Sequence, residues 1–485
     1  MSPQRDQVDI IVIGGGIAGM ASAVRAAELG ATVALLEQGE KLDYPCNSRY
    51  SGGMFHLAYH DIAMPADQLS RSLRAKAPQD VDHDLVDLIA TNALRAVDWL
   101  RDAAGARFFR VGPAPYEKWV LSPPRPPKPR LVWPDRGPDR VLRNLAANLS
   151  ARAMPVRLGH RVTQVSPSSG GGFSVTVCVQ GSNSQVLHSK AVVFADGGFQ
   201  AKKDLLAEFI SPDPDRVLQR NAGTGLGTSI SMAETLGADV SDTTAFYGHL
   251  VGRRALETDE LWPYPMIDGL AGAGILVSSD GQRFADEGRG GVYMSNAVAR
   301  QQNPTESYVI VDDKIWRTVG RLTRVPANPV LCNRGGELFT ADTLEELARK
   351  AGVDTDGLAM SVATHNKAVK DSSGSELKVA RSGTSAKPID TAPFHAIPVC
   401  AGITYTMGGL RIDGLARVRA KAGGVLQGLY AAGSAVGNIE GGQFSFYLGG
   451  LCKALVLGLT SGENVALFLR EHKANQANSS LKGIS

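Results

Sequence analysis

The feature that most constrains this chain of 485 residues is a glycine-rich turn that follows an apolar strand at the N-terminus. Residues 8–13 read VDIIVI, a β-branched run typical of a buried parallel strand. In the next segment, GGGIAG, Gly14 permits a tight turn and Gly16 a close approach of the backbone to a ligand. Gly19 permits a helix to pack closely on the strand. This pattern predicts the first strand and helix of a βαβ unit.

The residues after the turn complete that unit. An Ala-rich helical pattern runs to Leu29, and a second strand over 32–36 ends at Glu37. The helix N-terminus supplies amide donors for a pyrophosphate, and Glu37 is placed to accept hydrogen bonds from the ribose of an adenosine. The acid argues against a 2′-phosphate and therefore against NADP, while FAD and NAD both remain open. The unit predicts a dinucleotide site.

Composition excludes several other classes of protein. The chain is 43% hydrophobic and 20% charged, an ordinary globular balance, and its length predicts two or more domains. A net charge of +3 without a basic run gives no support to nucleic acid or a membrane surface as partner. The five cysteines are scattered and form no metal, cluster or haem motif. The polar N-terminus and the lack of a long apolar stretch favour a cytoplasmic protein that does not span a membrane.

Further elements can be placed along the chain. Helical patterns cover 80–105 and 140–152, a Pro-rich loop covers 122–138, and strands are expected over 156–165, 173–179 and 190–195. Between about 238 and 391 the elements become shorter and turns more frequent. We therefore expect a second domain inserted into the first.

Five segments in order along the chain resemble those of a known flavoprotein family. They are the N-terminal turn, residues 47–53 (NSRYSGG), residues 195–199 (ADGGF), residues 281–287 (GQRFADE), and a C-terminal block containing TYTMGG, GLYAAG and YLGG. Together they resemble fumarate reductases, succinate dehydrogenases and L-aspartate oxidases, including soluble ketosteroid and tricarballylate dehydrogenases.

The resemblance implies an α/β fold with FAD as cofactor. A Rossmann-like FAD-binding domain is built from both chain ends, 1–237 and 392–485, and an inserted α+β capping domain covers 238–391. The cofactor residues that follow are Gly14, Gly16, Ile17, Ala18, Gly19, Glu37, Gln38, Cys46, Asn47, Ser48, Ser51, Gly52, Gly53, Val162, Ala195, Asp196, Gly197, Gly433, Ser434, Gly449, Gly450 and Leu451. Cys46 is either a small residue packed beside FAD or the site of a covalent cysteinyl-flavin bond. Ser434 replaces an acid that is frequent in the family, which alters the ribityl contact.

The chain departs from the fumarate-reducing members at two substrate positions. Where they carry a carboxylate-binding histidine and arginine, this chain has Tyr405 and Tyr447. A neutral phenol cannot form the bidentate clamp of an arginine, so a C4 dicarboxylate is not expected to be held in the usual way. A ketone oxygen suits phenols better, because they can stabilise a developing enolate without adding charge.

The arginine that protonates substrate in the reductases is also displaced. Arg289 follows Glu287 by two residues instead of four, so it is either the catalytic arginine or a surface side chain. The acid–arginine proton relay of the reductases is replaced by Ile267 and Leu270. This loss favours dehydrogenation over reduction.

A dehydrogenase needs a base for the proton alpha to the carbonyl, and a tyrosine base needs nearby charge to stabilise its phenolate. Tyr405, Tyr447 and Arg289 are the first candidates, with Tyr247 and His249 of the capping domain and Thr406 as further site residues. For His249 a structural role is equally open.

We therefore predict an FAD-dependent dehydrogenase that introduces a C=C bond beside the carbonyl of a cyclic ketone or oxo-acid. Hydride passes to flavin N5 and the proton to a tyrosine. The alternatives are a fumarate-reductase-like enzyme with Arg289 as proton donor, and a flavin-binding subunit without turnover. The predicted partners are a small-molecule substrate and an external electron acceptor or donor.

Overall fold

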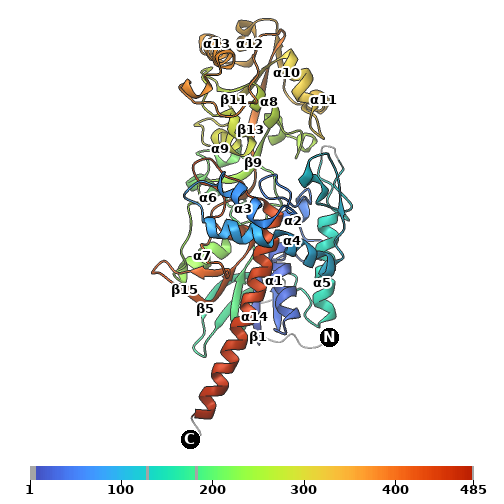
Figure 1. The fold of residues 1–485 in the computed structure, drawn as a ribbon, viewed down its shortest axis with the longest axis vertical. Coiled ribbons are helices and arrows are strands. Elements are labelled where there is room, and N and C mark those ends of the chain that lie inside the picture. Colours follow the sequence, from blue (N-terminus) through green and yellow to red (C-terminus); the bar gives the residue numbers. More distant parts are fainter. Residues whose placement is uncertain (1–6, 127–129, 181–183, 483–485) are drawn as a thin grey trace.

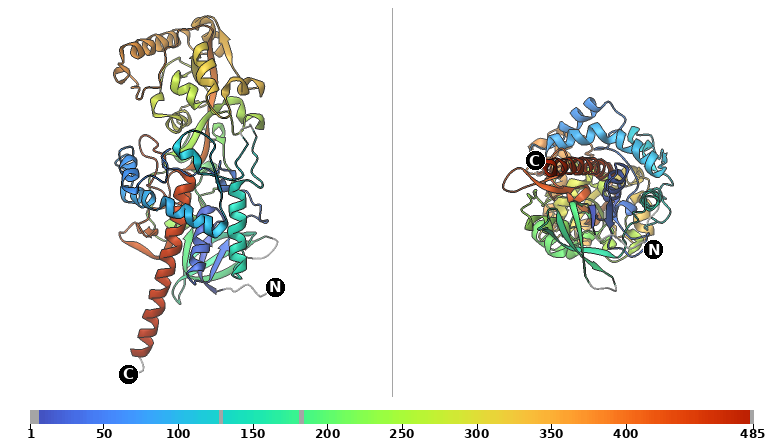
Figure 2. Two further views of the ribbon diagram at one scale, coloured as in Figure 1. Left: turned by 45° about the vertical axis from the view of Figure 1, so that its right-hand side comes forward. Right: turned by 90° about the horizontal axis from the view of Figure 1, so that it is seen from below.

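The computed structural model describes residues 7–126, 130–180 and 184–482. The molecule is elongated, and two sheets lie one above the other along its long axis (Figure 1). We call the first sheet with its helices the lower lobe, and the second sheet with its helices the upper lobe. The chain termini lie in or below the lower lobe, and the upper lobe is farthest from them in both side views (Figure 2).

The lower lobe is built on a mixed sheet, in which β2, β1, β7 and β15 run parallel. Within the described residues it has seven strands, ordered β14-β15-β7-β1-β2, with β6 attached to β7 and β5 to β6. The strands are β1 (Gln7–Ile13), β2 (Val33–Leu36), β5 (His160–Pro167), β6 (Phe173–Val179), β7 (Gln185–Phe194), β14 (Arg417–Arg419) and β15 (Val425–Ala431). Because β15 pairs in parallel with β7, and β7 with β1, strands from both chain ends share one sheet, as the resemblance implies. A separate hairpin joins β3 (Phe108–Phe109) to β4 (Val120–Leu121).

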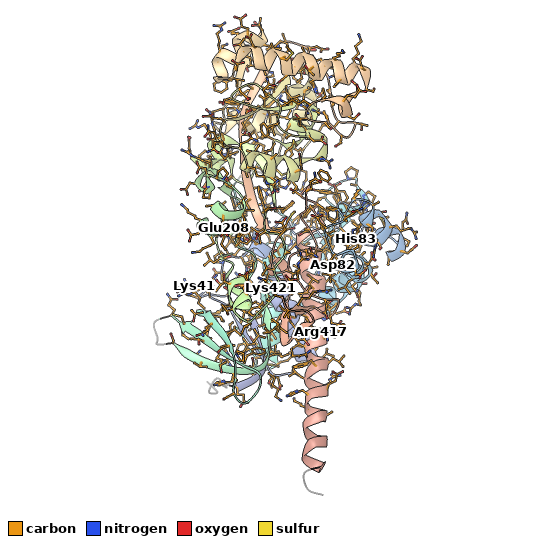
Figure 3. The ribbon with its side chains drawn as sticks, turned by 90° about the vertical axis from the view of Figure 1, so that its left-hand side faces the viewer. Lys41, Asp82, His83, Glu208, Arg417 and Lys421 are labelled. Atoms are coloured by element: carbon orange, nitrogen blue, oxygen red, sulfur yellow. The ribbon has the colours of Figure 1, made fainter. Side chains whose placement is uncertain are left out.

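Helices cover this sheet. They are α1 (Ile17–Glu28), α2 (Asn47–Tyr50), α3 (Ala66–Arg74), α4 (His83–Ala104), α5 (Gly137–Ala151), α6 (Lys203–Phe209), α7 (Thr228–Thr235) and α14 (Gly450–Lys482). The carboxylate of Asp82, labelled in Figure 3, accepts from the backbone amides of Asp84 and Leu85 and so caps α4. The expected strand over 156–165 begins only at His160, because the chain turns at Gly159 with φ of +68°.

The upper lobe is built around one long strand, β13 (Phe394–Thr406). It pairs with β8 (Leu218–Gln219), β9 (Phe246–Gly252), β11 (Ser307–Asp312) and β12 (Phe339–Ala341), and β10 (Ile275–Ser278) pairs with β11. Around the sheet lie α8 (Asp268–Ala273), α9 (Gly291–Ala299), α10 (Asp313–Thr318), α11 (Ala327–Asn333), α12 (Leu344–Ala351) and α13 (Thr355–Asp371). The second sheet takes β8 from before residue 238 and β13 from after residue 391, and the domain boundaries themselves stay a prediction.

The helix α14 corrects one expectation from the sequence. Its segment Gly450–Ala474 is long and apolar enough to cross a bilayer, with a mean hydropathy of 1.3. However, 72% of that apolar window is buried inside the fold, where α14 packs against α1 and α4. Length and composition of this kind are also typical of a core helix.

Candidate active site

Two connected hollows lie in the molecule. A groove of about 130 Å³ runs past the start of α1, and a cavity of about 340 Å³ lies where the two lobes meet. Asn47, Ser48, Ser434 and Ala454 line both, so the groove opens into the cavity. A long ligand can therefore lie in the groove and end in the cavity.

The groove is shaped by the turn between β1 and α1. A Cβ atom on Gly14, whose φ is +100°, would lie 2.6 Å from the Cα of Asp196, and one on Gly19 would lie 2.0 Å from the Gly14 carbonyl oxygen. Gly19 therefore serves helix packing and does not line the groove. The hydroxyl of Ser48 accepts a hydrogen bond from the amide of Ile17 at 3.0 Å, which fixes α2 to the start of α1.

Two acids face the groove. The carboxylate of Glu37 accepts from the amides of Gly15 and Gly39, each at 2.8 Å, and burial raises its pKa. Burial also raises the pKa of Asp196 to about 6, and its Oδ1 has no hydrogen-bond partner among the described residues. A buried carboxylate oxygen without a partner fits a ligand hydroxyl, and Glu37 keeps further acceptor sites for a ribose.

Most of the predicted cofactor residues line one of the two hollows. Those in the groove are Gly14, Gly16, Ile17, Ala18, Glu37, Gln38, Cys46, Asn47, Ser48, Val162, Ala195, Asp196, Gly197, Gly433 and Ser434, and those in the cavity include Ser51, Gly52, Gly53, Gly450 and Leu451. Gly449 lines neither hollow, and its amide bonds to Glu440. Burial raises the pKa of the Cys46 thiol to about 11, which disfavours the reactive thiolate.

Three tyrosines are brought together in the cavity by the β9–β13 ladder and the start of α14. Tyr247 on β9 and Tyr405 on β13 are registered partners, with ring centroids 5.3 Å apart. Tyr447 stacks on Tyr247 with centroids 4.2 Å apart. Thr406 is one residue beyond, but its hydroxyl accepts from the amide of Phe199 and does not line the cavity.

Tyr247 begins a chain of hydrogen bonds into the upper lobe. Its hydroxyl lies 3.0 Å from Nε2 of His249, and Nδ1 of His249 lies 2.5 Å from a carboxylate oxygen of Asp268. The carboxylate accepts from the proton on Nδ1, so in the neutral imidazole Nε2 carries no proton and can accept the hydrogen bond from Tyr247. The structure thus places a proton acceptor behind a phenol that faces the cavity.

The Tyr405 hydroxyl takes part in a different arrangement, with partners from the lower lobe. Its hydroxyl donates to Glu440, with both carboxylate oxygens at 3.1 Å, and the fully buried Lys453 forms an ion pair with the same carboxylate. The amides of Leu448 and Gly449 also donate to Glu440, at 2.8 and 3.0 Å. The proton of Tyr405 is therefore committed to a buried carboxylate.

Electrostatics separates these two phenols. Burial raises the pKa of Tyr247 to about 12, but the charge of Arg220 and a hydrogen bond from Tyr447 act to lower it. Burial and the charge of Glu440 both push the pKa of Tyr405 well above its usual value. Of the two, Tyr247 is the phenol whose anion is better stabilised.

Arg289 lies outside the cavity lining. Its guanidinium pairs with Asp286 at 3.0 Å and lies 3.4 Å from the ring centroid of Phe444. The nearby Glu287 is buried between Arg283 and Arg381, at 2.6 and 3.1 Å, and so the GQRFADE segment braces the upper lobe.

Sequence reasoning missed several residues that line the cavity or lie behind it. Arg125 comes from the Pro-rich loop and Arg220 follows β8, and no pattern singled out either. The sequence analysis singled out Ile267 and Leu270 but not Asp268, which lies between them. Lys453 did carry a signal, because one cation in the apolar run GLCKALVLGL indicates a buried partner.

Comparison with known proteins agrees with this geometry. The family model described as FAD binding domain matches residues 9–445. The chain belongs to this family of flavoproteins. FAD is its cofactor, and the β1–α1 turn, Glu37 and Asp196 are the groups in the groove that fit its dinucleotide part. The resemblance to the fumarate reductase and succinate dehydrogenase flavoproteins, a family of flavin oxidoreductases, is confirmed.

Two relatives and one solved structure with different named activities are similar to this chain. The chain is 28% identical to an NADH:acrylate oxidoreductase of Vibrio harveyi, covering 79% of this chain but only 37% of that protein. It is 26% identical to a cytochrome-type fumarate reductase of Shewanella frigidimarina, covering 97% of this chain and 79% of that protein. A 3-ketosteroid delta1-dehydrogenase from Sterolibacterium denitrificans shares the fold, with a TM-score of 0.71 at 19% identity over 96% of this chain and 100% of that one.

Proposed function

We propose that this protein is an FAD-dependent dehydrogenase that introduces a C=C bond next to a carbonyl. The observation that carries the proposal is the Tyr247–His249–Asp268 chain, which leads from the cavity to a proton acceptor. FAD, when bound, supplies the hydride chemistry, and the upper lobe covers it. The electrons then leave through an external carrier.

In this proposal Tyr247 takes the acidic proton from the substrate carbon. Its own hydroxyl proton passes to Nε2 of His249, so no free phenolate has to persist in a buried site. Asp268 holds Nδ1 of His249 and stabilises the imidazolium that forms, the role of an aspartate in a catalytic triad.

The substrate oxygen needs a donor whose proton is not held by a carboxylate. Tyr405 is unsuitable, because its proton is held by Glu440. We assign this role to Tyr447, whose hydroxyl can turn from Tyr247 to the developing enolate oxygen. Tyr405 then acts as a rigid wall of the cavity.

A reductase of an activated C=C bond is the second candidate, because several relatives are named as reductases. The same three residues would then deliver a proton to carbon in the reverse direction, whereas Arg289 lies outside the cavity. The hypothesis of a subunit without turnover is disfavoured by a cavity of about 340 Å³ beside the proton chain.

Anaerobic mixing tests the proposal. The purified yellow protein is mixed with cyclic ketones, oxo-acids and dicarboxylates while the absorbance of oxidised flavin is followed. Bleaching by a saturated carbonyl compound, with the unsaturated compound as product, is the expected result. If none of these bleaches it, and the dithionite-reduced protein is reoxidised by an unsaturated acid, the reductase is correct instead.

A further inference from the structure

Two arginines face the cavity without an acid to balance them. Arg125 and Arg220 both contribute to its lining, and the described residues that line it include no aspartate or glutamate. Each guanidinium lies near the ring of Tyr264, at 5.3 and 5.5 Å from its centroid. Two cations that share one hollow repel each other, and an anion between them removes this repulsion.

Arg125 in particular has donors without partners. Its Nε and Nη2 atoms are buried and make no hydrogen bond to any described residue. Burial and the charge of Arg220 both act to lower its pKa, against a stabilising contact with Tyr264. Buried guanidinium donors without acceptors are costly, so this geometry is suited to a ligand that brings acceptors of its own.

Arg220 is held in place but not neutralised. Its Nε donates to the carbonyl of Pro263 at 3.1 Å, and Nη1 donates to the hydroxyl of Thr404 at 3.2 Å. These neutral acceptors orient the guanidinium and leave its charge uncompensated. The same charge acts on the Tyr247 hydroxyl, which places it close to the proton chain.

FAD itself does not account for these charges. Its pyrophosphate fits the groove at the start of α1, and neither arginine lines that groove. The partners of the two side chains, Pro263 and Tyr264, belong to the upper lobe. The remaining walls are largely aromatic, with Tyr50, Tyr59 and Trp262 among them.

We propose that Arg125 and Arg220 form an anion subsite, so that the substrate carries a carboxylate in addition to the carbonyl beside which it is oxidised. This rests on the proposed function and selects the oxo-acid over the neutral cyclic ketone. A planar carboxylate can accept paired hydrogen bonds from a guanidinium, and the aromatic walls hold the apolar body. This anion subsite is therefore formed by residues other than Tyr405 and Tyr447.

Three cyclic ketones test this, one of them charged and two neutral. They are 4-oxocyclohexanecarboxylate, its methyl ester and cyclohexanone, each titrated anaerobically into the FAD-loaded protein. The perturbation of the flavin spectrum gives the dissociation constant, and any bleaching is recorded separately. We expect the acid to bind roughly 10- to 100-fold more tightly than the ester, as charged hydrogen bonds predict.

Variants of the two arginines then test whether these residues cause the difference in affinity between acid and ester. Arg125→Gln and Arg220→Gln should each weaken binding of the acid by roughly 10-fold or more and leave the ester unchanged. Arg125→Lys should retain part of the affinity, since it keeps the charge. Arg140→Gln, on the exposed side of α5, is the matched control and should have no effect.

The outcomes separate the two proposals. Equal affinities for acid and ester, no binding of the acid, or unchanged affinity in both Gln variants would overturn the anion subsite even if a ketone bleaches the flavin. Arginine-dependent binding of the acid without bleaching by any probe supports the subsite and counts against dehydrogenation of this ketone class. Loss of FAD from a Gln variant, while the Lys variant binds the acid no better than the ester, assigns that arginine to the cofactor instead.

Discussion

Two walls of one cavity present the same side chain in opposite chemical settings. On the upper wall the Tyr247 hydroxyl faces a histidine that can take its proton. On the lower wall the Tyr405 hydroxyl faces the Glu440 carboxylate, which is already paired with Lys453. The two tyrosines are registered neighbours in one ladder, so the residue behind each phenol, and not its position, decides what it can do.

The difference also corrects the order of the candidates. The sequence placed Tyr405, Tyr447 and Arg289 together as the first candidates and Tyr247 among the further ones. Burial raises the pKa of both phenols, but Arg220 and Tyr447 oppose this rise at Tyr247, whereas Glu440 adds to it at Tyr405. We test the contrast first at the two phenols and then at the buried groups around them.

The largest contrast is expected between two Tyr-to-Phe variants. Tyr247→Phe removes the proton acceptor and should slow flavin reduction by about 10³-fold, within the range of general acid–base catalysis. Tyr405→Phe should slow it by less than about 10-fold, since it removes one ordinary hydrogen bond. Stopped-flow reduction with any substrate that bleaches the flavin measures both, and equal losses would remove the distinction between the walls.

We expect the Glu440–Lys453 ion pair behind the lower wall to stabilise the folded protein. Glu440→Gln leaves the buried Lys453 charge unpaired and should lower the free energy of unfolding by about 3–5 kcal/mol. The double variant Glu440→Gln/Lys453→Met should recover a large part of this. Denaturant unfolding of the FAD-loaded protein is the measurement, with Glu463→Gln at a half-exposed ion pair as control. A Gln variant as stable as the parent would show that the pair is not structural.

We expect His56, which lines the cavity, to make the stability of the protein depend on pH. Burial lowers the pKa of this histidine to about 4 in the folded protein, below its ordinary value of 6.5. Between these two pH values only the unfolded chain takes up the proton, so stability falls as pH drops from about 6.5 to 4, by at most ~3 kcal/mol. His56→Gln should flatten this part of the pH–stability curve, and an unchanged slope would contradict the assignment.

The smallest effect is expected at Asp268, which contacts His249 behind Tyr247. Asp268→Asn keeps the shape but loses the charge that supports a protonated His249, so flavin reduction should slow by about 10²-fold or less. The variant should bind the ketone probes with unchanged affinity, which a general loss of structure would not allow. Asp286→Asn, beside Arg289 and outside the cavity, is the control.

Local units could be predicted from the sequence, whereas contacts between distant segments could not. The β1–α1–β2 unit lies within one or two residues of its expected bounds, since a buried strand and an Ala-rich helix are specified by nearby residues. The tyrosines and His249 were found through the family resemblance, not through periodicity.

The unpredicted residues depend on contacts between distant segments. Arg125 lines the cavity with its guanidinium near the ring of Tyr264, a residue far along the chain, and no local pattern encodes that contact. Asp268 matters only because α8 starts beside β9, where its carboxylate meets both the His249 ring and the Leu250 amide. Glu440 has no local signal either, although its partner Lys453 does.

The long strand β13 has a mechanical consequence. Tyr405 and Tyr247 sit on the same ladder and move together with the upper lobe, whereas Glu440 and Tyr447 belong to the lower lobe. Any hinge rotation that opens the cavity to admit substrate must therefore pull Tyr405 from Glu440 and unstack Tyr447 from Tyr247. Tyr247, His249 and Asp268 all belong to the upper lobe, so such a rotation would separate the two phenols from their lower-lobe partners and leave the proton path intact.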